Sequence, residues 1–179
     1  RDRSEHGMGS SIPTGYFSLD ALLGGGFRKN FGIIGGRPGQ GKTALAGNMI
    51  LHQGRLGHCV GLISLEMGRD PIWDRFISNI ASINTVKLDN GCLDSCDWAA
   101  IVEANNELSQ MAIIIDDSPG GQPVAEIRRI CRQLKKRGAE IIYIDQLSKI
   151  RGKGSSLYEM NTFVVNEISP LAKELEIQT

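Results

Sequence analysis

The stretch Gly36-Arg37-Pro38-Gly39-Gln40-Gly41-Lys42-Thr43 matches the pattern G-x-x-x-x-G-K-[ST] at every fixed position. This pattern is typical of a loop that binds a nucleoside triphosphate, because its glycines let successive backbone N–H groups converge on phosphate oxygens. The helix that follows adds the partial positive charge of its N-terminus. Lys42 is expected to reach the β- and γ-phosphates, and the Thr43 hydroxyl is an expected Mg²⁺ ligand. The predicted nucleotide-binding residues are Gly36, Arg37, Pro38, Gly39, Gln40, Gly41, Lys42, Thr43 and Ala44.

The sequence on both sides of this phosphate loop supports the interpretation. Residues 31–34 (Phe-Gly-Ile-Ile) predict a short apolar strand that enters the loop, and residues 44–52 predict the helix that leaves it. A chance match in a chain with 22 glycines would have no reason to fall between a strand and a helix. The context therefore favours a functional loop.

Length and charge bound the possible functions. The chain has 179 residues, with 20 Lys and Arg against 20 Asp and Glu, so any nucleic-acid surface must be local. No apolar run is long enough to span a membrane and no signal peptide opens the chain, so we expect a soluble, cytoplasmic protein. We expect residues 1–11 to be a linker or an expression scar, and residues 12–179 to form one domain.

Strands alternate with helices along this domain. After the phosphate loop, apolar strands are predicted at residues 59–65, 112–115 and 141–144, with amphipathic helices between them. The alternation is typical of an α/β fold with a mostly parallel sheet and helices on both faces. Right-handed crossovers place the C-terminal ends of the strands at one edge, where ligands bind in open α/β sheets.

Acidic residues follow three of the predicted strands. Asp145 comes after four residues of a buried strand, which is the Walker B pattern of an acid that supports Mg²⁺. From spacing alone Asp116 fits nearly as well, because three isoleucines precede it. Glu66 is the best candidate for the base that orients or deprotonates water, since it ends the strand after the loop's helix, and such a strand often lies beside the one entering the loop. For Asp117 we favour a helix cap or an exposed strand end.

Two groups of basic residues are candidates for nucleic-acid contact. The denser run, at residues 128–137, lies on a helix predicted to cover the sheet, so a solvated helix face is favoured there. Arg151 and Lys153 lie in a glycine-rich loop at the ligand edge and are the better candidates for DNA phosphates. Cys92 and Cys96 have no second Cys or His pair at zinc spacing, which favours reduced, structural cysteines.

Short motifs follow one another along the domain: Ile12-Pro13-Thr14-Gly15-Tyr16 with Leu19-Asp20, Arg37-Pro38 with Gly41-Lys42-Thr43, Ser64-Leu65-Glu66-Met67, Ile115-Asp116-Asp117-Ser118-Pro119, Ile144-Asp145 with Leu147, and Leu171-Ala172-Lys173-Glu174-Leu175. In this order they resemble the C-terminal, RecA-like ATPase domain of DnaB-type replicative DNA helicases, phage versions included. The motifs around Glu66 and Asp116 are the most specific, because RadA- and KaiC-like relatives share the start of the pattern but not these.

The resemblance implies a RecA-like P-loop NTPase that uses ATP and Mg²⁺. Such a protein forms a hexamer, hydrolyses ATP between subunits and moves along single-stranded DNA, unwinding duplex; a primase or a helicase loader is a further expected partner. The resemblance makes Glu66 the catalytic base, with Lys42 as a second catalytic residue, and makes Asp145 the Walker B acid. Asp116 and Asp117 become a family signature without an assigned catalytic role.

The chain also departs from the family pattern. Gln146 stands where the family usually has an aromatic residue, and the chain reaches Thr179 where the family's next strand should begin. We therefore expect a fragment or a shortened relative that binds nucleotide better than it hydrolyses it. Two other functions stay open at this point: a regulatory nucleotide-binding module, and a RecA-, RadA- or KaiC-like ATPase without unwinding activity.

Overall fold

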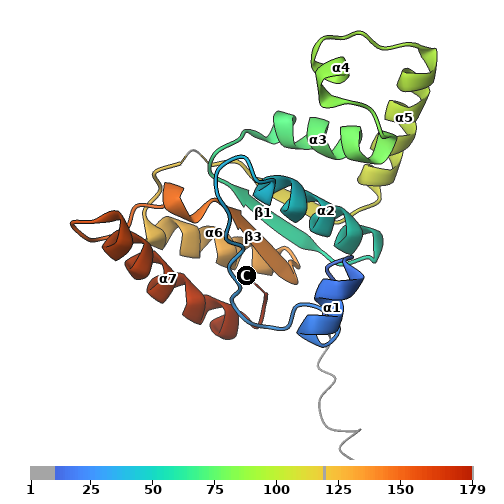
Figure 1. The fold of residues 1–179 in the computed structure, drawn as a ribbon. Coiled ribbons are helices and arrows are strands. Elements are labelled where there is room, and N and C mark those ends of the chain that lie inside the picture. Colours follow the sequence, from blue (N-terminus) through green and yellow to red (C-terminus); the bar gives the residue numbers. More distant parts are fainter. Residues whose placement is uncertain (1–10, 119, 179) are drawn as a thin grey trace, which may run out of the picture.

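Three parallel strands form a sheet in the part of the chain that the structure describes. The structure, a computed structural model, describes residues 11–118 and 120–178. Its strands β1 (Val60–Ser64), β2 (Ile113–Asp116) and β3 (Ile141–Asp145) lie in the order β2-β1-β3, and β1 pairs in parallel with both neighbours. Their C-terminal ends therefore lie at one edge of the sheet (Figure 1). The predicted α/β class with a parallel sheet is confirmed.

Both faces of β1 are buried, as its continuous apolar sequence predicts. One face carries Val60 and Leu62, which belong to a cluster with residues of α2 (Lys42–Arg55), α3 (Arg69–Ala81) and α5 (Ser95–Ser109). Figure 1 shows α2 lying across the strands on this side, with α3 beyond it. This packing fixes the helix that follows the phosphate loop against the sheet.

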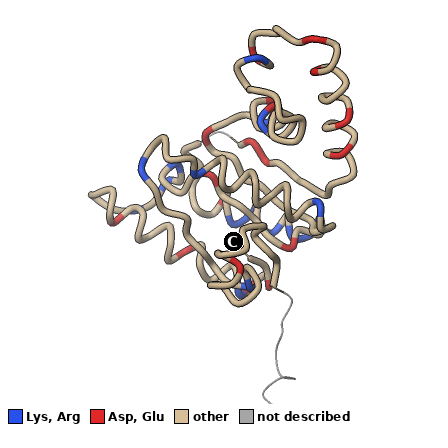
Figure 2. The backbone as a smooth tube through the Cα atoms, turned by 45° about the vertical axis from the view of Figure 1, so that its right-hand side comes forward, with Lys and Arg blue, Asp and Glu red and all other residues tan. Residues whose placement is uncertain are grey.

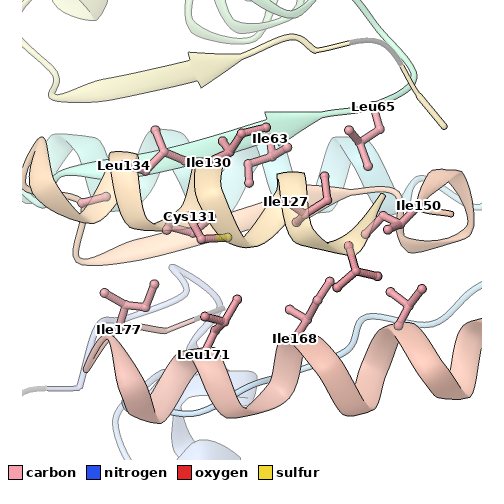
Figure 3. Packing of buried hydrophobic residues seen from close by; sticks show 14 residues of the cluster. Ile63, Leu65, Ile127, Ile130, Cys131, Leu134, Ile150, Ile168, Leu171 and Ile177 are labelled. Carbon is pink, nitrogen blue, oxygen red and sulfur yellow. The ribbon is translucent and has the colours of Figure 1, made fainter. Parts of the chain in front are cut away.

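The other face of β1 is covered by α6 (Val124–Lys136), and α7 (Leu157–Glu174) packs against α6 (Figure 3). Gly61 allows the close approach of α6, since a Cβ atom at this position would lie 3.0 Å from the Leu134 side chain. Ile63 points to the same side and is fully buried. The predicted helices on both faces are thus confirmed.

A stripe of buried side chains on α7 makes a large contribution to this core. Val164, Ile168 and Leu171 are each 0% exposed, and Figure 3 shows Ile168 and Leu171 pointing toward α6. Replacing Ile168 with alanine is expected to lower the free energy of unfolding by about 2–5 kcal/mol, because apolar burial is lost and a cavity remains. Urea denaturation measures this loss. The control is Val102→Ala on α5, where the side chain is 57% exposed, and it should change stability by less than about 0.5 kcal/mol. Equal losses of stability in Ile168→Ala and Val102→Ala would contradict the role of Ile168 in the core.

The shorter elements are α1 (Phe17–Leu23), α4 (Thr85–Asp89) and a 3-10 turn η1 (Leu147–Lys149). Figure 1 shows α4 standing out from the sheet together with the start of α5. Within the described ranges, no helix combines the length and apolar character needed to cross a membrane. Of the expected linker, residues 1–10 lie outside the described residues, and Ser11 donates a 3.2 Å hydrogen bond to the turn after α1.

The strand predicted at residues 31–34 is wrong. This segment makes no strand pairing within the described residues, and Ile33 and Ile34 are 64% and 40% exposed. A strand forms only where a neighbouring strand edge takes up its hydrogen bonds. Both edges of β1 are occupied, and on the outer edge of β3 the residue that pairs with Ile141 is Gln178. The segment leads into the phosphate loop without joining the sheet.

Candidate functional site

A cleft of about 930 Å³ opens at the C-terminal edge of the sheet. Its lining includes the phosphate loop with Lys42 and Thr43, Glu66, which lies two residues beyond β1, and the end of β3 with Asp145 and Gln146. From there the cleft continues between α2 and α3. The fold thus brings Lys42, Thr43, Glu66 and Asp145 to one cavity. Of the other predicted nucleotide-binding residues, the lining includes Pro38, Gly39, Gly41 and Ala44 but not Gly36, Arg37 and Gln40.

The phosphate loop has the backbone conformation that its glycines permit. Gly39 and Gly41 have φ angles of 77° and 80°, in the left-handed region that other residues rarely adopt. The Gln40 side chain closes the loop by accepting a 2.9 Å hydrogen bond from the Arg37 N–H. α2 begins at Lys42 rather than at residue 44, and no side chain among the described residues caps its N-terminus. The first N–H groups of α2 can therefore bind an anion.

The Lys42 side chain is folded over the phosphate loop. Its Nζ donates hydrogen bonds to the carbonyl oxygens of Gly36 and Arg37, at 2.9 and 3.0 Å. Both partners are neutral, so an anionic phosphate oxygen would be a stronger acceptor for this ammonium group. Lys42 is thus held close to the place where the sequence pattern expects the phosphates.

Thr43 and Asp145 meet although 102 positions separate them in the sequence. The Thr43 Oγ1 donates a 2.8 Å hydrogen bond to Asp145 Oδ2. A hydroxyl and a carboxylate are hard oxygen ligands of the kind that Mg²⁺ prefers, so the pair fits this ion. Asp116 is placed differently: it ends β2, on the other side of β1, and its Oδ1 accepts a 3.2 Å hydrogen bond from the Ser118 N–H. The structure therefore favours Asp145 over Asp116 as the acid beside Thr43, a choice that sequence spacing left open.

A buried hydrogen-bond network ties α2 to β3. The Tyr143 hydroxyl donates to Gln53 Oε1 at 2.9 Å, and Gln53 Nε2 donates to the Pro13 carbonyl oxygen at 3.0 Å. Burial raises the pKa of Tyr143 above its ordinary value, although the hydrogen bond to Gln53 acts in the opposite direction. Tyr143 is therefore a neutral donor at physiological pH. The network holds the helix that carries Thr43 against the strand that carries Asp145.

Glu66 lines the cleft from the end of β1. The neighbours of β1 are β2 and β3, so the expectation that this strand lies beside the segment entering the phosphate loop is wrong. Glu66 lies instead next to the end of β3, where Gln146 Nε2 donates a 2.6 Å hydrogen bond to its Oε2. Behind it, the Ser64 hydroxyl donates to the Met67 carbonyl oxygen at 2.7 Å. Sequence reasoning gave Gln146 no role at the site, because this contact follows from the pairing of β1 with β3.

Asp117 caps α3 from the end of the neighbouring strand. α3 begins at Arg69, and the preceding Gly68 has no side chain that could cap it. Asp117 Oδ2 accepts a 3.2 Å hydrogen bond from the Arg69 N–H, and the Arg69 guanidinium donates to the Ile115 carbonyl oxygen at 3.1 Å. This arrangement is a form of the cap favoured from the sequence. The cap thus anchors the C-terminal end of the segment that joins β1 to α3 and contains Glu66.

Replacing Asp117 with alanine is expected to lower the free energy of unfolding by about 1 kcal/mol, the usual cost of losing an N-terminal cap. Asp117→Asn keeps an oxygen acceptor, so its loss should be clearly smaller. Urea denaturation of both variants and of the unaltered chain provides the comparison. If alanine and asparagine destabilised the chain equally, charge rather than capping would be the important property of Asp117.

Arg151 and Lys153 lie on an exposed loop after η1. The Arg151 N–H donates to the Gln122 carbonyl oxygen at 2.8 Å, and Lys153 Nζ lies 5.8 Å from the centroid of the Phe163 ring, within cation–π range. Figure 2 shows charges of both signs spread over the fold, and α5 carries Asp and Glu but no Lys or Arg. A basic surface on this protein is therefore local, as its zero net charge predicts.

Two arginines of α6 pair with glutamates of α7, whereas Arg129 pairs with Glu126 of its own helix. Arg128 lies 3.1 Å from Glu167, and Arg132 lies 2.8 Å from Glu174. The hydrogen bond from Arg132 holds the pKa of Glu174 below its ordinary value. These contacts join the two helices and give Arg128 and Arg132 a structural role.

Comparison with known proteins places these features in a family. Residues 11–179 match the model described as "DnaB-like helicase C terminal domain". The chain is 35% identical over 173 residues to the replicative DNA helicase DnaC of Bacillus subtilis (strain 168) and 37% identical over 174 residues to the replicative DNA helicase DnaB of Geobacillus stearothermophilus. Each match covers 94% of this chain but only 38% of the relative, so the chain spans well under half the length of these proteins.

Solved structures agree with the sequence relatives. One of them, the structure of an ATPase domain, superposes with a TM-score of 0.86 at 30% identity, covering 94% of this chain and 62% of that one. A second structure, of a DnaB-like replicative helicase and its interactions with primase, also gives a TM-score of 0.86 at 30% identity, covering 94% and 42% of the two chains. The fold implied by the sequence resemblance is thereby confirmed.

Proposed function

Because the chain belongs to the DnaB-like helicase C-terminal domain family, we propose that it is the ATP-hydrolysing motor domain of a replicative DNA helicase. The observation that carries the proposal is the presence of Lys42, Thr43, Glu66 and Asp145 around one cleft at the ligand edge of the sheet. Family membership does not favour the regulatory module or the RecA-, RadA- or KaiC-like ATPase without unwinding activity.

The phosphate loop, with Ala44 after it, is the proposed binding site for the phosphates of ATP. The N–H groups at the start of α2 are open, and Lys42 would exchange its two carbonyl partners for phosphate oxygens. Thr43 and Asp145 would hold Mg²⁺, either directly or through water. When bound there, the ion would neutralise charge on the phosphates.

Glu66 is the proposed catalytic base. Its carboxylate would accept a proton from a water molecule, whose oxygen forms a bond to the γ-phosphorus. The bond between the γ-phosphorus and the oxygen that joins it to the β-phosphate breaks in the same reaction, which leaves ADP and inorganic phosphate. The position of Glu66 on the lining of the same cleft as Lys42 supports this role.

We further propose single-stranded DNA as the track of this motor and other copies of the chain as its partners in a hexamer. A primase or a helicase loader is a further proposed partner, and one of the similar solved structures is of a DnaB-like helicase and its interactions with primase. Arg151 and Lys153 are the proposed DNA contacts, because they are exposed and basic, whereas Arg128 and Arg132 of α6 are engaged with α7.

Strand separation by the protein that contains this domain tests the helicase proposal. A labelled strand should leave a forked DNA substrate when ATP and Mg²⁺ are present, and it should stay annealed with a non-hydrolysable ATP analogue. ATP hydrolysis without release of the strand would support the proposed ATPase activity and contradict the proposed helicase activity. A protein that binds nucleotide without hydrolysing it would support the regulatory alternative.

A further inference from the structure

We propose that Gln146 is a positioning residue that holds the Glu66 carboxylate in the orientation needed to take a proton from water. This inference rests on the proposed role of Glu66 as the base. It concerns a residue outside the phosphate loop and beyond the Walker B acid, at a position where the motifs of the sequence assign no function.

Strand pairing brings the two side chains together. β1 and β3 are adjacent and parallel, with Ser64 opposite Asp145, and the Leu65 N–H donates to the Asp145 carbonyl oxygen at 2.7 Å. The ladder thus continues to the last residue before Glu66. Glu66 and Gln146 both lie just beyond the ends of these neighbouring strands, and both line the cleft.

The contact uses only part of the Glu66 carboxylate. Gln146 Nε2 donates to Oε2 at 2.6 Å. A carboxylate has two oxygens that accept hydrogen bonds, so Oε1 is left for the proton of a water molecule. The donor is also a neutral amide. A lysine or arginine in its place would oppose protonation of the carboxylate by its charge, whereas an amide fixes the orientation without that penalty.

Gln146 restrains the side chain of Glu66, whereas the other contacts nearby restrain only the backbone around it. The connection after β1 is held by the Ser64 hydroxyl, which contacts both the carbonyl oxygen and the N–H of Met67. Its far end is anchored by Arg69 and Asp117. The Glu66 side chain itself is exposed, and among the described residues its only hydrogen bond comes from Gln146. A free glutamate side chain samples several rotamers, so this bond reduces that freedom before substrate arrives.

Two substitutions test the inference in the protein that contains this domain. Gln146→Met has a similar size but cannot donate, and Gln146→Asn keeps the amide on a shorter side chain. Both are expected to lower kcat for ATP hydrolysis about 10-fold to 100-fold, the scale of a misplaced catalytic group, while KM and the affinity for a fluorescent ATP analogue stay within about twofold. Gln110→Met, an exposed glutamine at the end of α5, is the matched control and should leave all three values unchanged.

A second measurement needs no turnover. In two-dimensional NMR spectra of this chain, the side-chain amide signals that disappear in Gln146→Met should shift in Glu66→Ala, and they should not shift in the exposed Glu103→Ala. Wild-type kcat in both Gln146 variants, or amide signals unmoved by Glu66→Ala, would overturn the inference while leaving the proposed function intact. Absence of hydrolysis by the unaltered protein would instead refute the proposed function, and the inference would fall with it.

Discussion

Glu66→Gln is expected to lower the rate of ATP hydrolysis about 100-fold to 10,000-fold, the range typical of removing a general base. The amide has the size of the carboxylate but cannot accept the proton of water at neutral pH. Nucleotide affinity should stay within about threefold, because the expected phosphate ligands are Lys42 and the N–H groups of α2, which the substitution leaves unchanged. Turnover assays and equilibrium binding of a fluorescent ATP analogue measure the two quantities separately.

The matched control for this substitution is Glu103→Gln. Glu103 is an exposed residue on α5, outside the lining of the cleft, and the same chemical change there should leave turnover and binding at wild-type values. Loss of nucleotide binding in Glu66→Gln would assign Glu66 to the binding site. Unchanged turnover would remove it from the mechanism.

Lys42→Ala is the second substitution with a large expected effect. Removing the ammonium deletes a charged donor to the phosphates, so affinity for ATP should fall at least about 10-fold, and turnover should become undetectable. The alanine also leaves the Gly36 and Arg37 carbonyl oxygens without the donor they have now. Because these groups are exposed, water replaces it, and the melting temperature should change by only a few degrees. Equilibrium binding and thermal melting check both statements.

Lys136→Ala serves as the control for lost positive charge. Lys136 is exposed on α6 and does not line the cleft, so ATP affinity should be unaffected. If both lysine variants weakened nucleotide binding equally, the effect would come from net charge and not from the phosphate loop. If Lys42→Ala bound ATP normally, the loop would have to be rejected as the phosphate site.

The sequence was sufficient for those parts of the fold that local patterns determine. The apolar runs that predicted three strands correspond to β1, β2 and β3 within a residue or two, and the longest run belongs to β1, which is buried along its whole length. Glycine spacing predicted the phosphate loop and the presence of a helix after it, although α2 begins at Lys42 and not at residue 44. Asp145 and Glu66 were selected as candidates because both acids come at the ends of such strands, at the edge of a parallel sheet where ligands bind.

Contacts between distant segments could not be predicted in this way. The strand expected at residues 31–34 is absent because pairing depends on a neighbouring edge, which a local apolar pattern does not report. Spacing left Asp116 and Asp145 nearly equal, and only the order of the strands places one of them beside Thr43. The contact between Gln146 and Glu66 likewise depends on the register of β1 with β3.

The most direct test of the proposed motor is the rate of ATP hydrolysis by the protein that contains this domain, measured with Mg²⁺ and increasing amounts of single-stranded DNA. A translocating motor couples hydrolysis to its track, so we predict a rate that rises several-fold and saturates as DNA is added, with no rise in Lys42→Ala. Hydrolysis that is absent, or that is the same with and without single-stranded DNA, would contradict the account.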